Sequence, residues 1–151
     1  MVHGKHQVTL NLPIDHVWNF VSNMDNWAPL VPGYTEHVMV NEFESIWKIH
    51  GDLGVIERTV SLRVTITEWI EPTNVHFQIS GLNGACTGEG YFQAKPLTDY
   101  ETEMTGYLNM KIKGMMGTVV NPVLKTVLPK AGREFTEAVA DKMQRKRVAA
   151  K

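Results

Sequence analysis

The sequence predicts an α+β fold in which a curved antiparallel β-sheet wraps around one long C-terminal helix, with two short helices after the first strand. Two observations predict this fold. Apolar and polar residues alternate from Thr35 to Ile112 with short turns between the runs, as in consecutive antiparallel strands. The segment from Gly114 to Lys146 instead repeats its apolar residues at helical spacing. A sheet with one apolar face needs a cover, and this helix is the candidate.

The chain opens with a strand, His6 to Leu12, whose apolar residues alternate. Pro13 then sits where the first turn of a helix tolerates proline. The short helix that follows has an apolar face made of Ile14, Val17, Trp18 and Val21. Met24 to Leu30 predicts one or two further helical turns, which the Val31-Pro32-Gly33 turn ends.

Six strands follow, separated by turns that include Gly51 to Gly54, Pro72 to Asn74, Gly81 to Gly84 and Pro96 to Asp99. The strongest strand signal is the strict alternation from Val60 to Ile66. The apolar positions of the six predicted strands are Val38 and Val40; Trp47 and Ile49; Val60, Leu62, Val64 and Ile66; Val75, Phe77 and Ile79; Cys86 and Phe92; and Met104, Leu108, Met110 and Ile112.

The long helix has an apolar stripe with Phe135 at its centre. At about 100° per residue, the stripe residues fall within roughly 60° of one direction. Pro122 and Pro129 project from the opposite side and should bend the helix around a core. The stripe consists of Val120, Leu124, Val127, Leu128, Ala131, Phe135, Ala138 and Val139.

One strand contributes little side-chain volume to the interior, because its inward row is Cys86, Gly88 and Gly90. Two interpretations remain open at this point. The glycines could leave the interior hollow, or they could mark a bulge or a tight bend of the sheet.

Size and composition restrict the class of protein. The 151 residues fit one domain with a sizeable core, and a net charge of −1 gives no indication of a nucleic-acid partner. Cys86 is the single cysteine, which is typical of a reducing cytoplasm. Residues 1–6 do not resemble a signal peptide, and no apolar run approaches the length of a membrane span. We therefore expect a cytoplasmic protein with at most peripheral membrane contact.

The sequence contains no evident set of catalytic or metal-binding residues. Six histidines are present, but none shares a helix with another ligand at metal-binding spacing, so neither a metal nor a cofactor is predicted. His50 and His76 should face outward, and Arg63, Glu89 and Glu103 should belong to the solvated face of the sheet. Cys86 should face the apolar interior, where a thiol is inert.

Three short motifs resemble the opening of the START-like (SRPBCC, Bet v 1-like) superfamily: Pro13-x-x-x-Val17-Trp18-x-Phe20, then Asp25-x-Trp27, then Val31-Pro32-Gly33. The Pro-Gly turn, the strand with Gly88-x-Gly90 and the glycine-rich entry to the last helix are most similar to the CoxG branch, whose members are associated with carbon monoxide dehydrogenase. The resemblance implies a helix-grip fold with an apolar cavity between sheet and C-terminal helix. It also implies apolar ligands such as lipids or quinones, and the recruitment of a redox enzyme to the membrane.

We therefore expect a non-catalytic binding or carrier protein for a hydrophobic, lipid-like or quinone-like small molecule, with an oxidoreductase as a possible partner. The alternative is a small polyketide cyclase/dehydratase-like enzyme with Tyr34 or Tyr107 as the acid, although Tyr107 should face outward. Ligand entry is expected at the turn from Val31 to Tyr34 or at Gly114 to Gly117. The candidate ligand-binding residues are Trp18, Trp27, Tyr34, Trp47, Val64, Phe77, Gly88, Gly90, Phe92, Met104, Leu108, Met110, Met116, Val120, Leu124 and Leu128.

Overall fold

The computed structural model describes residues 2–52, 57–82, 84 and 86–149, and of residues 2, 3, 52, 57, 58, 116 and 146–149 it describes only the backbone. The described elements follow the predicted order of strand, short helices, six strands and long helix. They are β1 (Val2–Leu10), α1 (Ile14–Val21), η1 (Met24–Asn26), η2 (Ala28–Leu30), β2 (Tyr34–Met39), β3 (Glu44–Asp52), β4 (Glu57–Ile70), β5 (Asn74–Gly81), β6 (Cys86–Thr98), β7 (Glu101–Ile112) and α2 (Met115–Ala149).

These elements confirm the α+β fold with a long C-terminal helix, and they differ from the predicted boundaries in small ways. Gly51 belongs to β3, while Gly54 lies outside the described residues. Pro96 continues β6, where the register with β7 shifts, so the turn into the last strand is shorter than expected. The described part of α2 contains no stretch long and apolar enough to cross a membrane, and neither does α1.

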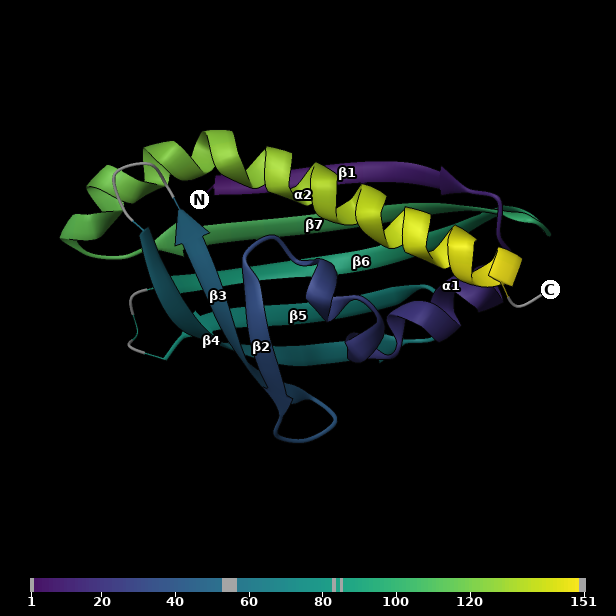
Figure 1. Ribbon diagram of the computed structural model, residues 1–151, viewed down its shortest axis with the longest axis horizontal. Helices are drawn as coiled ribbons and strands as arrows, with labels where there is room; N and C mark the ends of the chain where they lie inside the picture. Colours follow the sequence, from purple (N-terminus) through teal and green to yellow (C-terminus); the bar gives the residue numbers. More distant parts are fainter. Residues whose placement is uncertain (1, 53–56, 83, 85, 150–151) are drawn as a thin grey trace.

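All seven described strands form one antiparallel sheet in the order β1-β7-β6-β5-β4-β3-β2. β2 and β3 run steeply across the direction of β5, β6 and β7 in the view of Figure 1, because the sheet is strongly twisted and curled. α2 packs on β1 and β7 at one edge of the sheet and also touches η2. The sequence suggested a helix that lies over the whole sheet, but α2 contacts this edge of the sheet. The η1–η2 segment lies beside α2 and connects it to β2.

The buried face of α2 only partly matches the predicted stripe. Val120, Leu124, Leu128 and Val139 are buried as expected. Val127 is 36% exposed, so its assignment to the buried face was wrong, whereas Phe135 is half-buried and packs against the main apolar cluster. Residues four apart on a helix lie about 40° apart around its axis. The buried line therefore drifts around α2 and continues through Thr136, Ala140 and Met143.

A glycine on β1 allows α2 to approach the sheet closely. A Cβ atom on Gly4 would lie 3.2 Å from both the carbonyl oxygen of Leu128 and the Cα of Pro129. Pro129 itself is exposed within the helix, as is Pro122. The close approach thus depends on a missing side chain on the strand.

The buried apolar residues that the structure describes form two clusters, and Met110 and Ile112 contact both of them. The larger one joins α1, the inner face of the sheet and the C-terminal half of α2, through residues such as Leu10, Val17, Trp47, Met104 and Val139. The smaller one contains Val120, Leu124 and Leu128 of α2, packed against three half-buried residues of β7: Leu108, Met110 and Ile112.

Candidate ligand-binding site

Four aromatic side chains meet where the curled sheet approaches α2. Trp47 of β3 lies with its ring centroid 5.9 Å from that of Trp27, which follows η1, and 5.9 Å from that of Tyr34 on β2. Trp27 in turn lies 6.0 Å from Phe135 of α2, edge to face. Trp47 is buried and the other three are half-buried. We call Trp27, Tyr34, Trp47 and Phe135 the aromatic wall.

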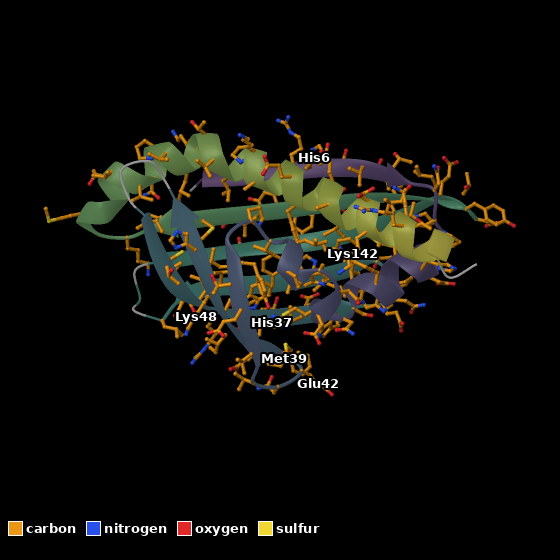
Figure 2. All side chains as sticks on the ribbon, in the orientation of Figure 1. His6, His37, Met39, Glu42, Lys48 and Lys142 are labelled. Atoms are coloured by element: carbon orange, nitrogen blue, oxygen red, sulfur yellow. The ribbon has the colours of Figure 1, made fainter. Side chains whose placement is uncertain are left out.

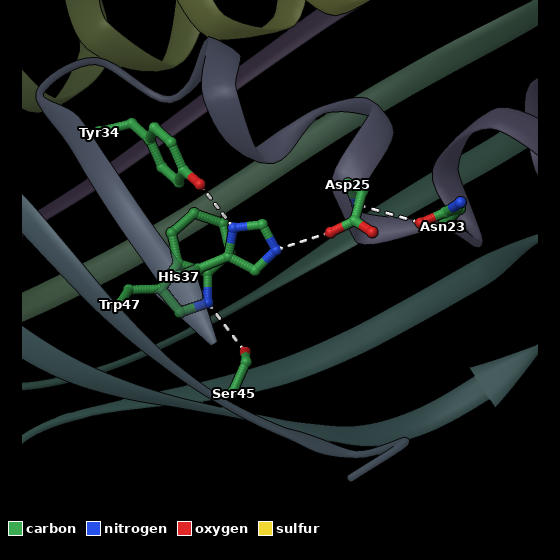
Figure 3. A network of polar contacts seen from close by, with 6 residues as sticks. All are labelled: Asn23, Asp25, Tyr34, His37, Ser45 and Trp47. Carbon is green, nitrogen blue, oxygen red and sulfur yellow. Dashed lines mark hydrogen bonds and ion pairs between the residues drawn. The ribbon is translucent and has the colours of Figure 1, made fainter. Parts of the chain in front are cut away.

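A chain of hydrogen bonds leads from this wall to the protein surface (Figure 3). The hydroxyl oxygen of Tyr34 lies 2.7 Å from Nδ1 of His37, and Nε2 of His37 lies 2.8 Å from a carboxylate oxygen of Asp25. The His37 side chain is only 10% exposed, whereas that of Asp25 is 72% exposed. The chain therefore connects a half-buried phenol, through a nearly buried imidazole, to a carboxylate in solvent.

The protonation pattern follows from the donors and acceptors in the chain. A carboxylate only accepts hydrogen bonds, so Nε2 of His37 carries the hydrogen that it donates to Asp25. In the neutral imidazole Nδ1 is then an acceptor, and the hydroxyl group of Tyr34 donates to it. In the imidazolium, Nδ1 donates to the Tyr34 oxygen instead. The direction of the hydrogen bond between Tyr34 and His37 therefore depends on the protonation state of the imidazole.

A β-bulge places Tyr34 and His37 on the same face of β2. Tyr34 pairs with Ile49 and Glu36 pairs with Lys48, so Thr35 is an extra residue that pairs with no residue of β3. Tyr34 and His37 consequently both lie on the face that carries Trp47. Without the bulge, residues three apart would point to opposite faces of the strand.

Further hydrogen bonds fix the residues around the Tyr34–His37–Asp25 network. The backbone N–H of Asp25 donates to Oδ1 of Asn23 at 3.1 Å. Lys142 of α2, labelled in Figure 2, donates from Nζ to the carbonyl oxygen of Asn26 at 2.8 Å and so ties η1 to the helix. The indole N–H of Trp47 donates to Oγ of the fully buried Ser45 at 2.8 Å. Both Asp25 and the ring of Trp47 are therefore held in position.

Sequence reasoning missed His37. It expected Val38 and Val40 as the apolar residues of this strand, but they are 62% and 58% exposed. The inward residues are Tyr34 and His37, and Met39 shares their face but is 44% exposed. Strict period-two alternation cannot locate a bulge, and no residue type in this stretch marks one. Tyr34 was a candidate residue, but its partners were not.

The structure places the other predicted ligand-binding residues in three surroundings. Trp18, Val64 and Met104 are buried in the main cluster, where Phe77 and Phe92 pack half-buried against them. Trp27 and Trp47 join Tyr34 in the aromatic wall. The helical candidates Val120, Leu124 and Leu128 form the smaller cluster with Leu108 and Met110, and the side chain of Met116 lies outside the described residues.

Gly88 and Gly90 do not leave open space, so the hollow-strand interpretation was wrong at these two positions. A Cβ atom on Gly90 would lie 2.5 Å from Cζ of Phe77 and 2.4 Å from the carbonyl oxygen of Tyr107. A Cβ atom on Gly88 would lie 2.4 Å from the carbonyl oxygen of Asn109. Both glycines thus sit where β6 and β7 approach too closely for a side chain, and the register with β7 runs without a bulge through both positions.

Two hydrogen bonds between Ile112 and Asn121 span the segment from Gly114 to Gly117, which was predicted as a ligand entrance. The side chain of Asn121 accepts from the N–H of Ile112 at 3.0 Å and donates to the carbonyl oxygen of Ile112 at 3.1 Å. Gly114 has a φ of +78°, and Met115 is 90% exposed. A Cβ atom on Gly117 would lie 2.3 Å from the carbonyl oxygen of Ile112, so alanine there would disturb packing as well as any hinge.

A groove of about 590 Å³ opens on the surface beside α1 and η1. It shares only Trp18 with the predicted site. Trp18 and Trp69 stand edge to face, 6.1 Å apart, and Met39 and Glu42 lie near the β2–β3 turn (Figure 2). The lining residues are Trp18, Ser22, Asn23, Met24, Asp25, Met39, Glu42, Trp69 and Glu71.

Several reactive groups lie away from the aromatic wall. Cys86 is buried, and burial raises the pKa of its thiol, as expected for an inert cysteine. Tyr107 stacks on Tyr91, with ring centroids 5.1 Å apart, and Tyr91 lies beside His76 on the outer face. His76 and Tyr107 thus face outward, as predicted. The described residues contain no group of three or more His, Cys, Asp or Glu side chains that could hold a metal ion.

Comparison with known proteins gives one family model that matches residues 1–148, nearly the whole chain. Among proteins with curated functions, none matches the sequence.

Three solved structures illustrate the similarity of the fold. The Zhui aromatase/cyclase from Streptomyces sp. R1128 is 16% identical, with 95% of this chain and 94% of that chain covered and a TM-score of 0.71. A START superfamily protein from Mycobacterium smegmatis is 12% identical, with 95% and 97% covered and a TM-score of 0.68. A norcoclaurine synthase point mutant from Thalictrum flavum, in complex with a transition state analogue, is 12% identical, with 96% and 95% covered and a TM-score of 0.66.

Proposed function

Because this chain belongs to the family whose model spans residues 1–148 and has the START-like (SRPBCC, Bet v 1-like) fold, we propose that it binds a hydrophobic small molecule between the inner face of the sheet and α2. The fold is typical of hydrophobic ligand binding. We propose further that the protein acts as a non-catalytic carrier of a lipid-like or quinone-like molecule. The resemblance to the CoxG branch supports that finer part and an oxidoreductase partner.

The observation that carries the proposal is the incomplete burial of apolar side chains on the inner face. Phe77 and Ile79 pair across the sheet with the buried residues Ile66 and Val64, so all four share one face. Phe77 and Ile79 nevertheless remain half-buried. Inward apolar side chains that keep contact with solvent have room beside them, and that room suits an apolar ligand.

A filling substitution tests this proposal. Ile79→Trp should abolish binding of the neutral fluorescent probe N-phenyl-1-naphthylamine, because the larger side chain would occupy the room beside Val64 and Phe77. Val38→Trp is the matched control, since Val38 is 62% exposed on β2. Thermal unfolding should show both variants folded. Equal probe affinity in wild type and Ile79→Trp would contradict the proposed location.

A second candidate function is that of a small polyketide cyclase/dehydratase-like enzyme, and the hydrogen-bonded chain from Asp25 through His37 to Tyr34 favours it. A phenol held by a base, which a third group orients, has the arrangement of a general acid–base catalyst. The test uses a β-polyketone thioester as substrate and measures the formation of the cyclic product by its absorbance. Tyr34→Phe should abolish ring formation. Tyr107→Phe should leave ring formation unchanged, because Tyr107 faces outward. Absence of product with the wild-type protein would contradict this candidate.

A further inference from the structure

The hydroxyl group of Tyr34 has hydrogen-bonding capacity beyond its contact with His37. A phenol offers one donor hydrogen and acceptor lone pairs, and the described structure gives this group the single contact to Nδ1. The other polar groups of the aromatic wall are the indole N–H groups of Trp27 and Trp47, which already donate to the carbonyl oxygen of Val21 and to Oγ of Ser45. Tyr34 is therefore the polar group of the aromatic wall best placed for a ligand.

We propose that Tyr34 donates a hydrogen bond to a carbonyl oxygen of the ligand and that His37, held by Asp25, takes up a proton when this bond forms. The ligand class is an apolar ketone or quinone-like carbonyl compound. This inference rests on the proposed binding function, and it adds the contact that selects the ligand.

Proton uptake follows from the single hydrogen of the phenol. In the neutral form Tyr34 donates that hydrogen to Nδ1 of His37, so it cannot also donate it to a carbonyl group. When Nδ1 gains a proton, it donates to the Tyr34 oxygen, and the phenol hydrogen becomes free for the ligand. No covalent bond between heavy atoms forms or breaks, and the one proton comes from solvent.

The groups around His37 favour this route. The alternative is a neutral imidazole with its hydrogen on Nδ1, which would turn the bare Nε2 towards the carboxylate of Asp25, where two acceptors repel. The ring of Trp47 lies 5.3 Å from the imidazole at 32°, a position in which an aromatic face stabilises a cation. Among the described charged groups, Asp25 contacts His37 directly, while Lys48 and Glu36 pair with each other.

The test uses 1-tetralone and its hydrocarbon analogue tetralin, which differ by the carbonyl group. Calorimetry in two buffers of different ionisation enthalpy measures both affinity and proton uptake. The wild-type protein should take up a fraction of a proton with 1-tetralone and none with tetralin. Tyr34→Phe should weaken the affinity for 1-tetralone about three- to tenfold and abolish proton uptake. It should leave the affinity for tetralin unchanged.

Asp25→Asn separates the proton relay from a merely structural role. An amide can donate to Nε2, so the neutral imidazole with hydrogen on Nδ1 becomes acceptable. This variant should bind 1-tetralone within about threefold of wild type but without proton uptake. If Tyr34→Phe weakens both compounds equally, or the wild-type protein takes up no proton, the inference is overturned while the binding function stands. If the wild-type protein binds neither compound, the binding function fails and the inference fails with it.

Discussion

The ring of Phe77 occupies the space above Gly90 on the neighbouring strand, so that a Cβ atom on Gly90 would lie 2.5 Å from Cζ of Phe77. The same Cβ would lie 2.4 Å from the carbonyl oxygen of Tyr107, and backbone cannot move aside as a flexible side chain can. The absence of a side chain at Gly90 is thus a requirement of packing between β5, β6 and β7.

Gly90→Ala should therefore destabilise the protein by about 1–3 kcal/mol, the usual cost of overpacking. Gly132→Ala is the matched control, because no atom lies within 4 Å of a Cβ built there. Alanine within helix α2 should stabilise by about 0.5–1 kcal/mol. Urea unfolding of both variants measures the difference. A neutral result for Gly90→Ala would show that the strands can separate without cost.

Phe135→Ala should cost less than the full core value of about 3–5 kcal/mol for a buried phenylalanine. The ring is half-buried and contacts Trp27 at its edge, so part of its surface has no protein partner to lose. Met143→Ala, at a position 3% exposed, should cost about 2–5 kcal/mol and serves as the comparison. Denaturant unfolding measures both losses. A loss at Phe135 within the full core range would instead indicate a filled interior.

The thiol of Cys86 should react slowly with a disulfide reagent in the folded protein. Burial raises the pKa of this thiol, so the reactive thiolate is scarcer at any given pH than in the unfolded chain. A raised folded-state pKa also stabilises the fold below the unfolded pKa, and this contribution is lost as pH rises through the folded value. Reaction rates with and without urea, measured at mildly alkaline pH, test this. Equal rates would contradict burial of the thiol.

The fold was predictable because its signals are local and repeated. The alternation of β4 and the helical spacing of α2 each follow from one face meeting a core, and both elements were confirmed. The drift of the buried line on α2 was not predictable, because it depends on how the helix crosses a twisted sheet. Val127 was misplaced for that reason.

The candidate site was predictable only in part. Trp27, Tyr34 and Trp47 were identified as interior aromatic residues, and they do lie together. The contact between Tyr34 and His37 depends on one extra residue in β2, and the contact to Asp25 depends on η1 folding back towards that strand. Neither relationship leaves a periodic trace in the sequence.

The central claim, that an apolar ligand lies between sheet and α2 with its oxygen at Tyr34, is tested most directly by locating a bound ligand. A crystal structure with 6-bromo-1-tetralone would place the bromine by its anomalous signal. We predict the bromine beside Phe77 and Ile79 on the inner face, with the ketone oxygen within hydrogen-bonding distance of the Tyr34 hydroxyl group. Bromine in the surface groove between Trp18 and Trp69, with no ligand on the inner face, would contradict the claim.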